Sequence, residues 1–441
     1  TGVYFFAITF TLVFIVLADL GFGTALTREL AKGAGQAVEY LNTILLTKMV
    51  LGGLVYGLIV ISANLLNYSE LTKNLIYLSG ITMFFDNIHN VFYAVFRAHK
   101  NLIYESIGIA ISQLITLIIG TIALFGGLPL YWLILAYTIP SFFNVLYSAY
   151  FVYKQFNWRP KFHLDMKLLK GFLLMAWPLA LAGIISRLYS FSDSLLMSKI
   201  LTARDLGLWG VVYKTSSAFY FIAIALAASA FPVFSSLYAS GDKIGLAKLF
   251  EKSYRYLFFI AFPLGGGILA LAKPAIWLVY GTDFTNAILP LQVVIFGLVF
   301  VFLTYVNGAL LNAVDKQKIQ TGLVGFTLCF NIILNLILLD EYGVLGAATA
   351  SLAASFILTQ LGLFFSRQAV SYISLSNIFK YFNQTFWPAA IMSAAVYYLS
   401  LFINFIFTIP IGAIIYFILV YLFGGLDREL LFRVKGKIFA S

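Results

Sequence analysis

Three charged residues lie within two otherwise apolar stretches of the chain. Arg187 and Asp193 belong to one stretch and Lys214 to the next. A charge at the centre of a membrane helix costs roughly 2.5–3.5 kcal/mol on insertion scales, so such residues usually face a protein interior or a wet cavity. Arginine offers a planar fork of donors and lysine a compact charge, and together they suit a diphosphate. Arg187 and Lys214 therefore predict an anion site at similar depth within the membrane.

Asp193 provides the alternative interpretation, in which it neutralises Arg187 as a structural pair. Six residues of α-helix turn through about 600°, which places the two side chains on different faces. A direct pair within the helix is therefore not expected. Asp193 is instead predicted to be an acidic group near the same cavity.

Asp86, His89 and Asn90 form a second polar group, at positions i, i+3 and i+4 of an apolar span. This spacing places all three on one helix face. A carboxylate beside a histidine suits proton or cation coupling, while His89 and Asn90 could bind sugar hydroxyls. The alternative is a satisfied polar patch that joins helices, and the sequence favours neither interpretation.

Lys48 and Asp19 lie nearer the ends of their spans. The long stem of Lys48 predicts that its ammonium reaches the lipid headgroups, and the alternative is that it binds a diphosphate arriving from the cytoplasm. Asp19, in the motif DLG, is a further candidate acidic group of the cavity. The single cysteine, Cys329, excludes an internal disulfide, and no Cys/His cluster predicts a metal site. We expect no cofactor beyond a coupling Na⁺ or H⁺.

The composition is that of an integral membrane protein. Hydrophobic residues make up 62% of the chain and charged residues 10%, against about 25% charged residues in soluble domains. Thirteen apolar spans have the length of about 20 residues that crosses a hydrocarbon core. They are too long for barrel strands and do not alternate, so the predicted fold class is all-α.

Lysine and arginine concentrate in one set of alternate loops. The opposite set contains only Lys73, Lys199, Arg204 and Lys273. This imbalance predicts that the basic loops and the C-terminus are cytoplasmic and that the protein spans the cell membrane. The net charge of +11 then follows from topology, so we expect no nucleic-acid partner.

Two copies of an ancestral unit are visible in the chain. The segment Gly2-Val3-Tyr4 corresponds to Gly207-Leu208-Trp209, and later matches follow in the same order. The second copy has six spans and the first only five, so we expect a further helix ahead of Thr1. Parallel repeats are typical of transporters with a substrate site between the halves. The predicted domains are an N-terminal lobe (1–160), a C-terminal lobe (165–366), an additional helix pair (379–425) and a basic cytoplasmic tail (426–441).

Four motifs, in this order and spacing, carry a resemblance to a known family. They are ADLGFGTALTRELAKG, SDSLLMSKILTARDLGLWGVVYK, FPLGGGILALAKPAIWLVYGTDFTNAILPLQVV and NIILNLILLDEYGVLGAATASLAAS. The chain resembles the polysaccharide flippases that translocate O-antigen and capsule repeat units, within the multidrug/oligosaccharidyl-lipid/polysaccharide exporter superfamily. The resemblance implies a MATE-like transporter fold. It also implies a cavity-lining first helix that this sequence does not contain.

The function implied by the resemblance is translocation of a polyprenyl-diphosphate-linked oligosaccharide from the cytoplasmic to the outer leaflet by alternating access. The expected partners are this lipid, membrane lipids and other polysaccharide assembly proteins. Three alternatives stay open: a cation-coupled multidrug exporter, a flippase for a lipid-linked peptidoglycan precursor, and a membrane polysaccharide polymerase. No nucleophile motif or phosphate-binding glycine loop stands out, which argues against an enzyme.

Overall fold

The computed structural model describes residues 2–31, 37–99, 101–156, 158 and 164–425. The described residues form helices joined by short turns, with no strand among them. The chain divides into two compact units, Thr1–Leu195 (unit 1) and Leu196–Ser441 (unit 2). The predicted tail, 426–441, lies outside the described residues.

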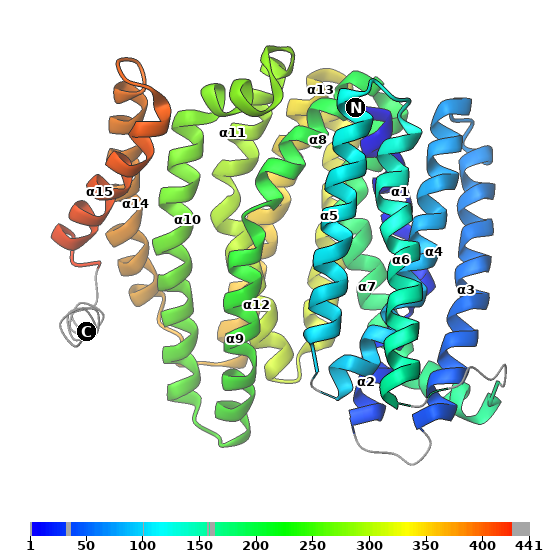
Figure 1. Ribbon diagram of the computed structural model, residues 1–441. Coiled ribbons are helices and arrows are strands. Elements are labelled where there is room, and N and C mark those ends of the chain that lie inside the picture. The colour runs from blue at the N-terminus through cyan, green and yellow to red at the C-terminus, as the bar shows by residue number, and fades with distance from the viewer. Residues whose placement is uncertain (1, 32–36, 100, 157, 159–163, 426–441) are drawn as a thin grey trace, which may run out of the picture. The chain divides into compact units, whose positions relative to one another are not determined.

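Unit 1 is built from long helices that run beside one another (Figure 1). In chain order they are α1 (Gly2–Asp19), α2 (Phe22–Ala31), α3 (Ala37–Leu65), α4 (Glu70–Ala98), α5 (Ile103–Phe125), α6 (Tyr131–Phe156) and most of α7 (Met166–Ile200). Helix α4 packs against α1, α2, α3 and α6 and is therefore the central helix of the unit.

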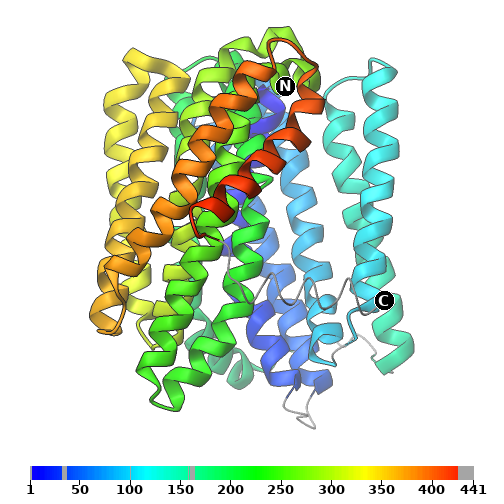
Figure 2. The same ribbon diagram turned by 90° about the vertical axis from the view of Figure 1, so that its left-hand side faces the viewer.

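Unit 2 contains the remaining helices, and its last two form the orange-to-red hairpin of Figure 2. They are α8 (Ala203–Ser217), α9 (Tyr220–Ala239), α10 (Lys243–Tyr280), the 3₁₀ turn η1 (Thr282–Ala287), α11 (Ile288–Phe296), α12 (Leu298–Ala313), α13 (Gln317–Ala369), α14 (Leu375–Leu399) and α15 (Phe405–Leu422). Helix α14 packs along α10 and thereby attaches the C-terminal pair to the rest of the unit.

The all-α membrane fold predicted from the sequence is confirmed. Every predicted span has its centre in a helix; the centres are Phe14, Gly52, Met83, Ile115, Tyr137, Ala182, Ile222, Gly266, Val299, Cys329, Ala354, Ala390 and Ile415. Within the described residues, nine helices are long and apolar enough to cross a membrane, and one of these, α13, contains two predicted spans. Helices α4, α7 and α14 coincide with predicted spans but are not among the nine. Two of these three carry charged residues singled out above, Asp86 on α4 and both Arg187 and Asp193 on α7.

The core of unit 1 joins α2, α3, α4, α6 and α7. Its buried members include Phe22, Phe92, Phe96 and Phe172. Trp158 also belongs to this core, and its indole N–H donates to Oδ1 of Asn42 at 2.9 Å. The indole is thus buried with its one donor satisfied, as a buried tryptophan requires.

Helix α7 is assigned to different parts of the chain by sequence repeat and by packing. By sequence repeat it opens the C-terminal lobe (165–366), whereas by packing its residues up to Leu195 belong to unit 1. Phe172 contacts Tyr40 of α3 with ring centroids 5.6 Å apart. The lobes are defined by sequence repeat and the units by packing. The division into units therefore does not test the predicted lobe boundaries, which stay a prediction.

Helix α13 is a hairpin of two spans that meet at Gly343. This residue has φ 54° and ψ −131°, which L-residues with a side chain rarely adopt. Gly346 lies so close to the preceding helix that a Cβ there would be 2.3 Å from the carbonyl oxygen of Leu338. These two glycines explain the spacing in the motif EYGVLGAATA, since they permit reversal of the chain with almost no loop.

Glu251 links α10 to the beginning of α14. Its side chain is buried, with the residue 6% exposed. One carboxylate oxygen accepts from the backbone N–H of Ser374 and the other from Nδ2 of Asn377, both at 2.7 Å. The carboxylate therefore satisfies donors at the N-terminus of α14, where negative charge is favoured.

Replacement of Glu251 by alanine is expected to lower the free energy of unfolding by about 1–3 kcal/mol, because the partly buried backbone N–H of Ser374 loses its acceptor. The measurement is denaturant unfolding of the purified protein in detergent micelles. Glu70→Ala is the matched control, since Glu70 has a side chain 81% exposed and its pair with Lys73 contributes about 1 kcal/mol or less. Equal losses of unfolding free energy in the two variants would contradict the role of Glu251 as an acceptor at the N-terminus of α14.

Candidate functional site

The first candidate site is an ion pair inside unit 1. Helix α1 ends at Asp19. Leu20 and Gly21 have positive φ angles and interrupt the helical conformation before α2 begins. The Asp19 carboxylate accepts from the ammonium of Lys48 on α3. Lys48 is 0% exposed, whereas the side chain of Asp19 is 41% exposed. The prediction that the Lys48 ammonium reaches the headgroups is therefore wrong: its stem is enclosed and its charge is neutralised by a residue of the helix break.

The predicted group on α4 is brought together in part. His89 Nδ1 lies 3.7 Å from Oδ1 of Asp86, and His89 is 9% exposed. Asn90 instead donates through Nδ2 to the backbone carbonyl of Asp86 at 2.7 Å, which is a local bond within the helix. Among the described residues, no group of three or more His, Cys, Asp or Glu side chains could hold a metal ion.

The intramembrane charges of the two units occupy different environments. On α7, Arg187 is exposed and Asp193 is buried (6% exposed), as expected for residues on different helix faces. Lys214 is exposed near the C-terminus of α8 in unit 2. Because Arg187 and Lys214 belong to different units, a shared anion site stays a prediction.

Unit 2 contains a cavity of about 900 Å³ that the sequence interpretation missed. Ligand cavities typically measure about 300–1,000 Å³, so this one could hold a sizeable molecule. Its walls come from α10, α11, α12, the second half of α13 and α14. No charged side chain is among the described residues that line it.

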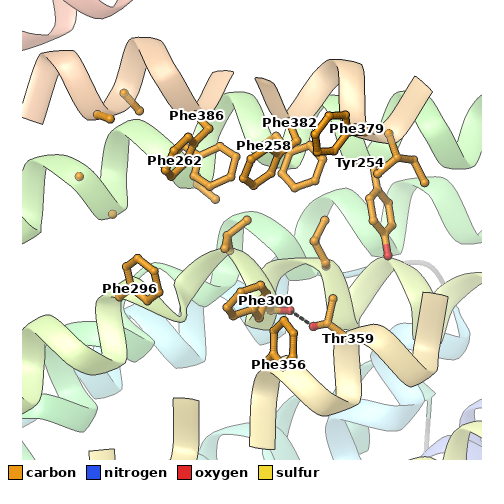
Figure 3. Close-up of a pocket in the computed structure, with 18 of the residues that line it drawn as sticks. Tyr254, Phe258, Phe262, Phe296, Phe300, Phe356, Thr359, Phe379, Phe382 and Phe386 are labelled. Atoms are coloured by element: carbon orange, nitrogen blue, oxygen red, sulfur yellow. Dashed lines mark hydrogen bonds between the residues drawn. The ribbon is translucent and has the colours of Figure 1, made fainter. Parts of the chain in front are cut away.

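Phenylalanine rings form the facing walls of this cavity (Figure 3). One wall consists of rings from α10 and α14, and the other of rings from α11, α12 and α13. The first wall comprises Phe258, Phe262, Phe379, Phe382 and Phe386, and the second Phe296, Phe300 and Phe356. The spacing of three or four residues on each of α10 and α14 places the rings of one helix on one face. That spacing is visible in the sequence, but the contact between the ring-bearing faces of α10 and α14 is not.

The rings interlock between the two helices. Phe258 and Phe262 are stacked, with centroids 5.4 Å apart and an interplanar angle of 12°. Phe382 of α14 meets both at nearly right angles, with centroids 5.8 and 5.2 Å away. Edge-to-face contacts of this kind contribute about 0.5–1.5 kcal/mol each beyond area burial. This wall is therefore packed in a fixed shape.

Three polar residues at the edge of the cavity, Tyr254, Thr359 and the neighbouring Asn307, are engaged in helix packing. The Tyr254 hydroxyl donates to Oδ1 of Asn307 at 2.6 Å, and Nδ2 of Asn307 donates to the carbonyl of Thr359 at 3.2 Å. The Thr359 hydroxyl donates to the carbonyl of Phe300 at 2.8 Å. Asn307 thus joins α10, α12 and α13, and the space left for a ligand is mostly apolar.

Long apolar helices, buried intramembrane charges and an apolar cavity are typical of a multi-pass membrane protein. The chain belongs to the family described as "Polysaccharide biosynthesis protein", which matches residues 1–238. The family described as "MatE" matches residues 178–337. Together these matches confirm the resemblance to polysaccharide flippases of the exporter superfamily.

Individual relatives agree with this assignment. The chain is 30% identical over 173 residues to "Probable flippase AglR" of Haloferax volcanii, a match covering 37% of this chain and 35% of that protein. Matches to the first curated relatives cover only 33–35% of their lengths. Among solved structures, "Lipid II flippase MurJ, inward closed conformation" has TM-score 0.77 and 19% identity, covering 97% of this chain and 93% of that one. A multidrug resistance MATE family transporter, inward-facing, has TM-score 0.69 and 13% identity, covering 84% and 90%. The MATE-like fold is thereby established.

The Asp19 and Lys48 pair predicts an asymmetry between its two single variants. Asp19→Ala leaves an ammonium buried without a counter-charge and is expected to cost about 3–5 kcal/mol of unfolding free energy. Lys48→Met is expected to cost less, because the partly exposed carboxylate can be hydrated. Denaturant unfolding in micelles measures both.

The double variant Asp19→Ala/Lys48→Met serves as the control, and it is expected to recover most of the stability lost in Asp19→Ala, since no buried charge is left unpaired. Equal losses in the two single variants, or additive losses in the double variant, would show that the pair is not a buried one.

Proposed function

We propose that this protein is a flippase that moves a polyprenyl-diphosphate-linked oligosaccharide from the cytoplasmic to the outer leaflet of the cell membrane. The observation that carries the proposal is the cavity of unit 2, walled by phenylalanine and free of charged side chains among its described lining residues. A branched, unsaturated hydrocarbon chain fits this chemistry. A sugar would leave its hydroxyls unpaired there.

The cavity would recognise a prenyl chain by shape. Lipid tails are as apolar as the cavity walls, so transfer of a chain from the bilayer into the protein brings little hydrophobic gain. Close packing of rings against the methyl branches would supply the binding energy through many small dispersion contacts. The fixed ring geometry of α10 and α14 supports such selection between branched prenyl and straight acyl chains.

Arg187 and Lys214 would attract the diphosphate, and Asp193 would balance their charge. Both cations are exposed side chains within helices of a membrane protein, and their chemistry is that of phosphate binding. With the cell interior negative, each negative charge moved outward gains about 2.3 kcal/mol per 100 mV. The membrane potential would thus favour export without ATP.

A cation-coupled drug exporter is the competing function, and the MatE match over residues 178–337 is the observation that favours it. Such a protein would bind cationic compounds and would need carboxylates in its binding cavity. The cavity of unit 2 offers none among its described lining residues, and the exposed intramembrane charges Arg187 and Lys214 are basic.

Removal of either cation is expected to slow translocation. Arg187→Ala and Lys214→Ala should each lower the rate about 10- to 100-fold, because a charge-assisted contact of about 1.5–3 kcal/mol is lost. The measurement is leaflet transfer of a fluorescent polyprenyl-diphosphate oligosaccharide in proteoliposomes. Lys273→Ala is the control, since Lys273 is exposed on α10, where its ammonium contacts the ring of Trp277, and it does not line the cavity. Unchanged transfer in both variants, or wild-type export of a cationic dye instead, would contradict the proposal.

Filling the cavity is expected to prevent binding of the lipid tail. Ala390→Trp adds a bulky ring at a lining position of α14 and should reduce transfer of the prenyl substrate at least tenfold. Ile391→Trp is the matched control, because Ile391 is 47% exposed on the same helix and does not line the cavity. Selection by shape is measured by competition. Unlabelled prenyl phosphate is expected to inhibit transfer of the fluorescent lipid, whereas a straight-chain acyl phosphate is not. Equal transfer by the two tryptophan variants would exclude the cavity as the tail site.

A further inference from the structure

Helix α10 contains a proline between residues that line the cavity of unit 2. Pro263 lies inside the helix, directly after Phe262 and two residues before Gly265, and both of these neighbours line the cavity. A proline has no N–H, so the carbonyl four residues earlier loses its helical partner. In α10 this carbonyl belongs to Phe259. The motif FPLGGG therefore leaves a backbone acceptor without its helical donor beside the cavity wall.

Helix α15 supplies the missing donor. The Tyr416 hydroxyl donates to the Phe259 carbonyl at 2.9 Å. Tyr416 is 2% exposed, so the bond is enclosed by protein. Hydrocarbon offers no donor to a carbonyl, and a buried tyrosine hydroxyl needs a partner of its own. The tyrosine and the proline turn of α10 thus satisfy each other.

Further contacts attach this part of the chain to α10. The ring centroid of Phe259 lies 5.7 Å from that of Tyr416 and 5.8 Å from that of Phe417. One turn earlier on α10, Nη2 of Arg255 donates to the carbonyl of Gly425 at 2.9 Å, just beyond the end of α15. The segment from Tyr416 to Gly425 is therefore bonded to two successive turns of α10 ahead of the proline.

The bond lies outside the cavity but next to its rings. Neither Phe259 nor Tyr416 is among the described residues that line the cavity, whereas Phe258 and Phe262 are (Figure 3). A proline is also a point at which a helix bends. A change of bend at Pro263 would move these two rings relative to the lining residues beyond the proline. The shape of the cavity therefore depends on what holds α10 at this turn.

Beyond the proline, α10 has supports of its own. A Cβ on Gly266 would clash with the hydroxyl oxygen of Ser393, so the missing side chain of glycine permits close contact with α14. Gln292 of α11 donates through Nε2 to the carbonyl of Leu269 at 3.0 Å. These contacts fix the part of α10 after the proline, and the Tyr416 bond supports the helix at the proline turn.

We propose that Tyr416 is a positioning residue for the cavity. Through the Phe259 carbonyl it sets the bend of α10 at Pro263, and thereby the ring spacing that distinguishes a branched prenyl chain from a straight acyl chain. The selection between lipids rests on the proposed function, whereas the support of α10 by Tyr416 does not. Helix α15 thus shapes a site to which it contributes no described lining residue.

The support of α10 is tested by a double-mutant cycle between Tyr416→Phe and Pro263→Ala, measured by denaturant unfolding in micelles. Tyr416→Phe removes only the hydroxyl, and Pro263→Ala restores a backbone N–H that can reach the Phe259 carbonyl. In the wild-type background, Tyr416→Phe should lower the folding equilibrium constant about three- to tenfold, the range of one hydrogen bond between membrane helices. In the Pro263→Ala background the effect should be much smaller. Equal effects in the two backgrounds would overturn the proposal.

Tyr421→Phe is the matched control for both tests. Tyr421 lies on the same helix and is 62% exposed, and its hydroxyl is bonded to no described residue. Its replacement should change neither the stability nor the selection between lipids.

The selection is tested by competition in proteoliposomes with the fluorescent lipid. The measured quantity is the concentration of straight-chain acyl phosphate that halves transfer, divided by the corresponding concentration of prenyl phosphate. This ratio should fall about three- to tenfold in Tyr416→Phe, because the rings then lose their fixed spacing. An unchanged ratio in Tyr416→Phe, even with slower transfer, would show a purely structural role and overturn the proposal.

Absence of transfer in every protein, the wild type included, would refute the proposed function. The double-mutant cycle does not depend on transfer, so it would still decide whether Tyr416 supports α10 at the proline turn.

Discussion

The structure depends on the fact that hydrocarbon cannot solvate a polar group, so each must find its partner inside the protein. Lys48 shows this most clearly. Its side chain is fully enclosed within unit 1, and its ammonium is matched by Asp19 at the point where α1 ends. The helix break and the ion pair thus depend on each other, because the irregular backbone brings the carboxylate to the buried charge.

The interiors of the two units accommodate polar groups in different ways. Unit 1 accepts polar side chains and bonds them between helices, as Tyr93 and Asn144 illustrate. Unit 2 keeps its cavity apolar and uses Asn307 to join the helices beside it. A lipid-linked sugar has one end of each kind, so a protein that handles it needs both environments.

Local features could be predicted from the sequence because they depend only on helix geometry. The spans, the all-α fold and the proximity of Asp86 to His89 all follow from length, composition and a spacing of three. The position of Lys48 was predicted wrongly, because its partner lies 29 residues earlier beyond a break that periodicity does not reveal. The cavity was missed because its walls come from helices far apart in the chain, although the spacing of Phe258 and Phe262 was visible.

The glycine hairpin of α13 has a consequence for biosynthesis. Because Gly343 and Gly346 leave almost no loop, the two spans are joined as one closely packed hairpin. The acidic residues Asp340 and Glu341 lie exposed beside the turn, on the side predicted to be external by the positive-inside pattern. Carboxylates held in hydrocarbon are costly, so we expect the two spans to leave the translocon together as a hairpin that keeps Asp340 and Glu341 in water.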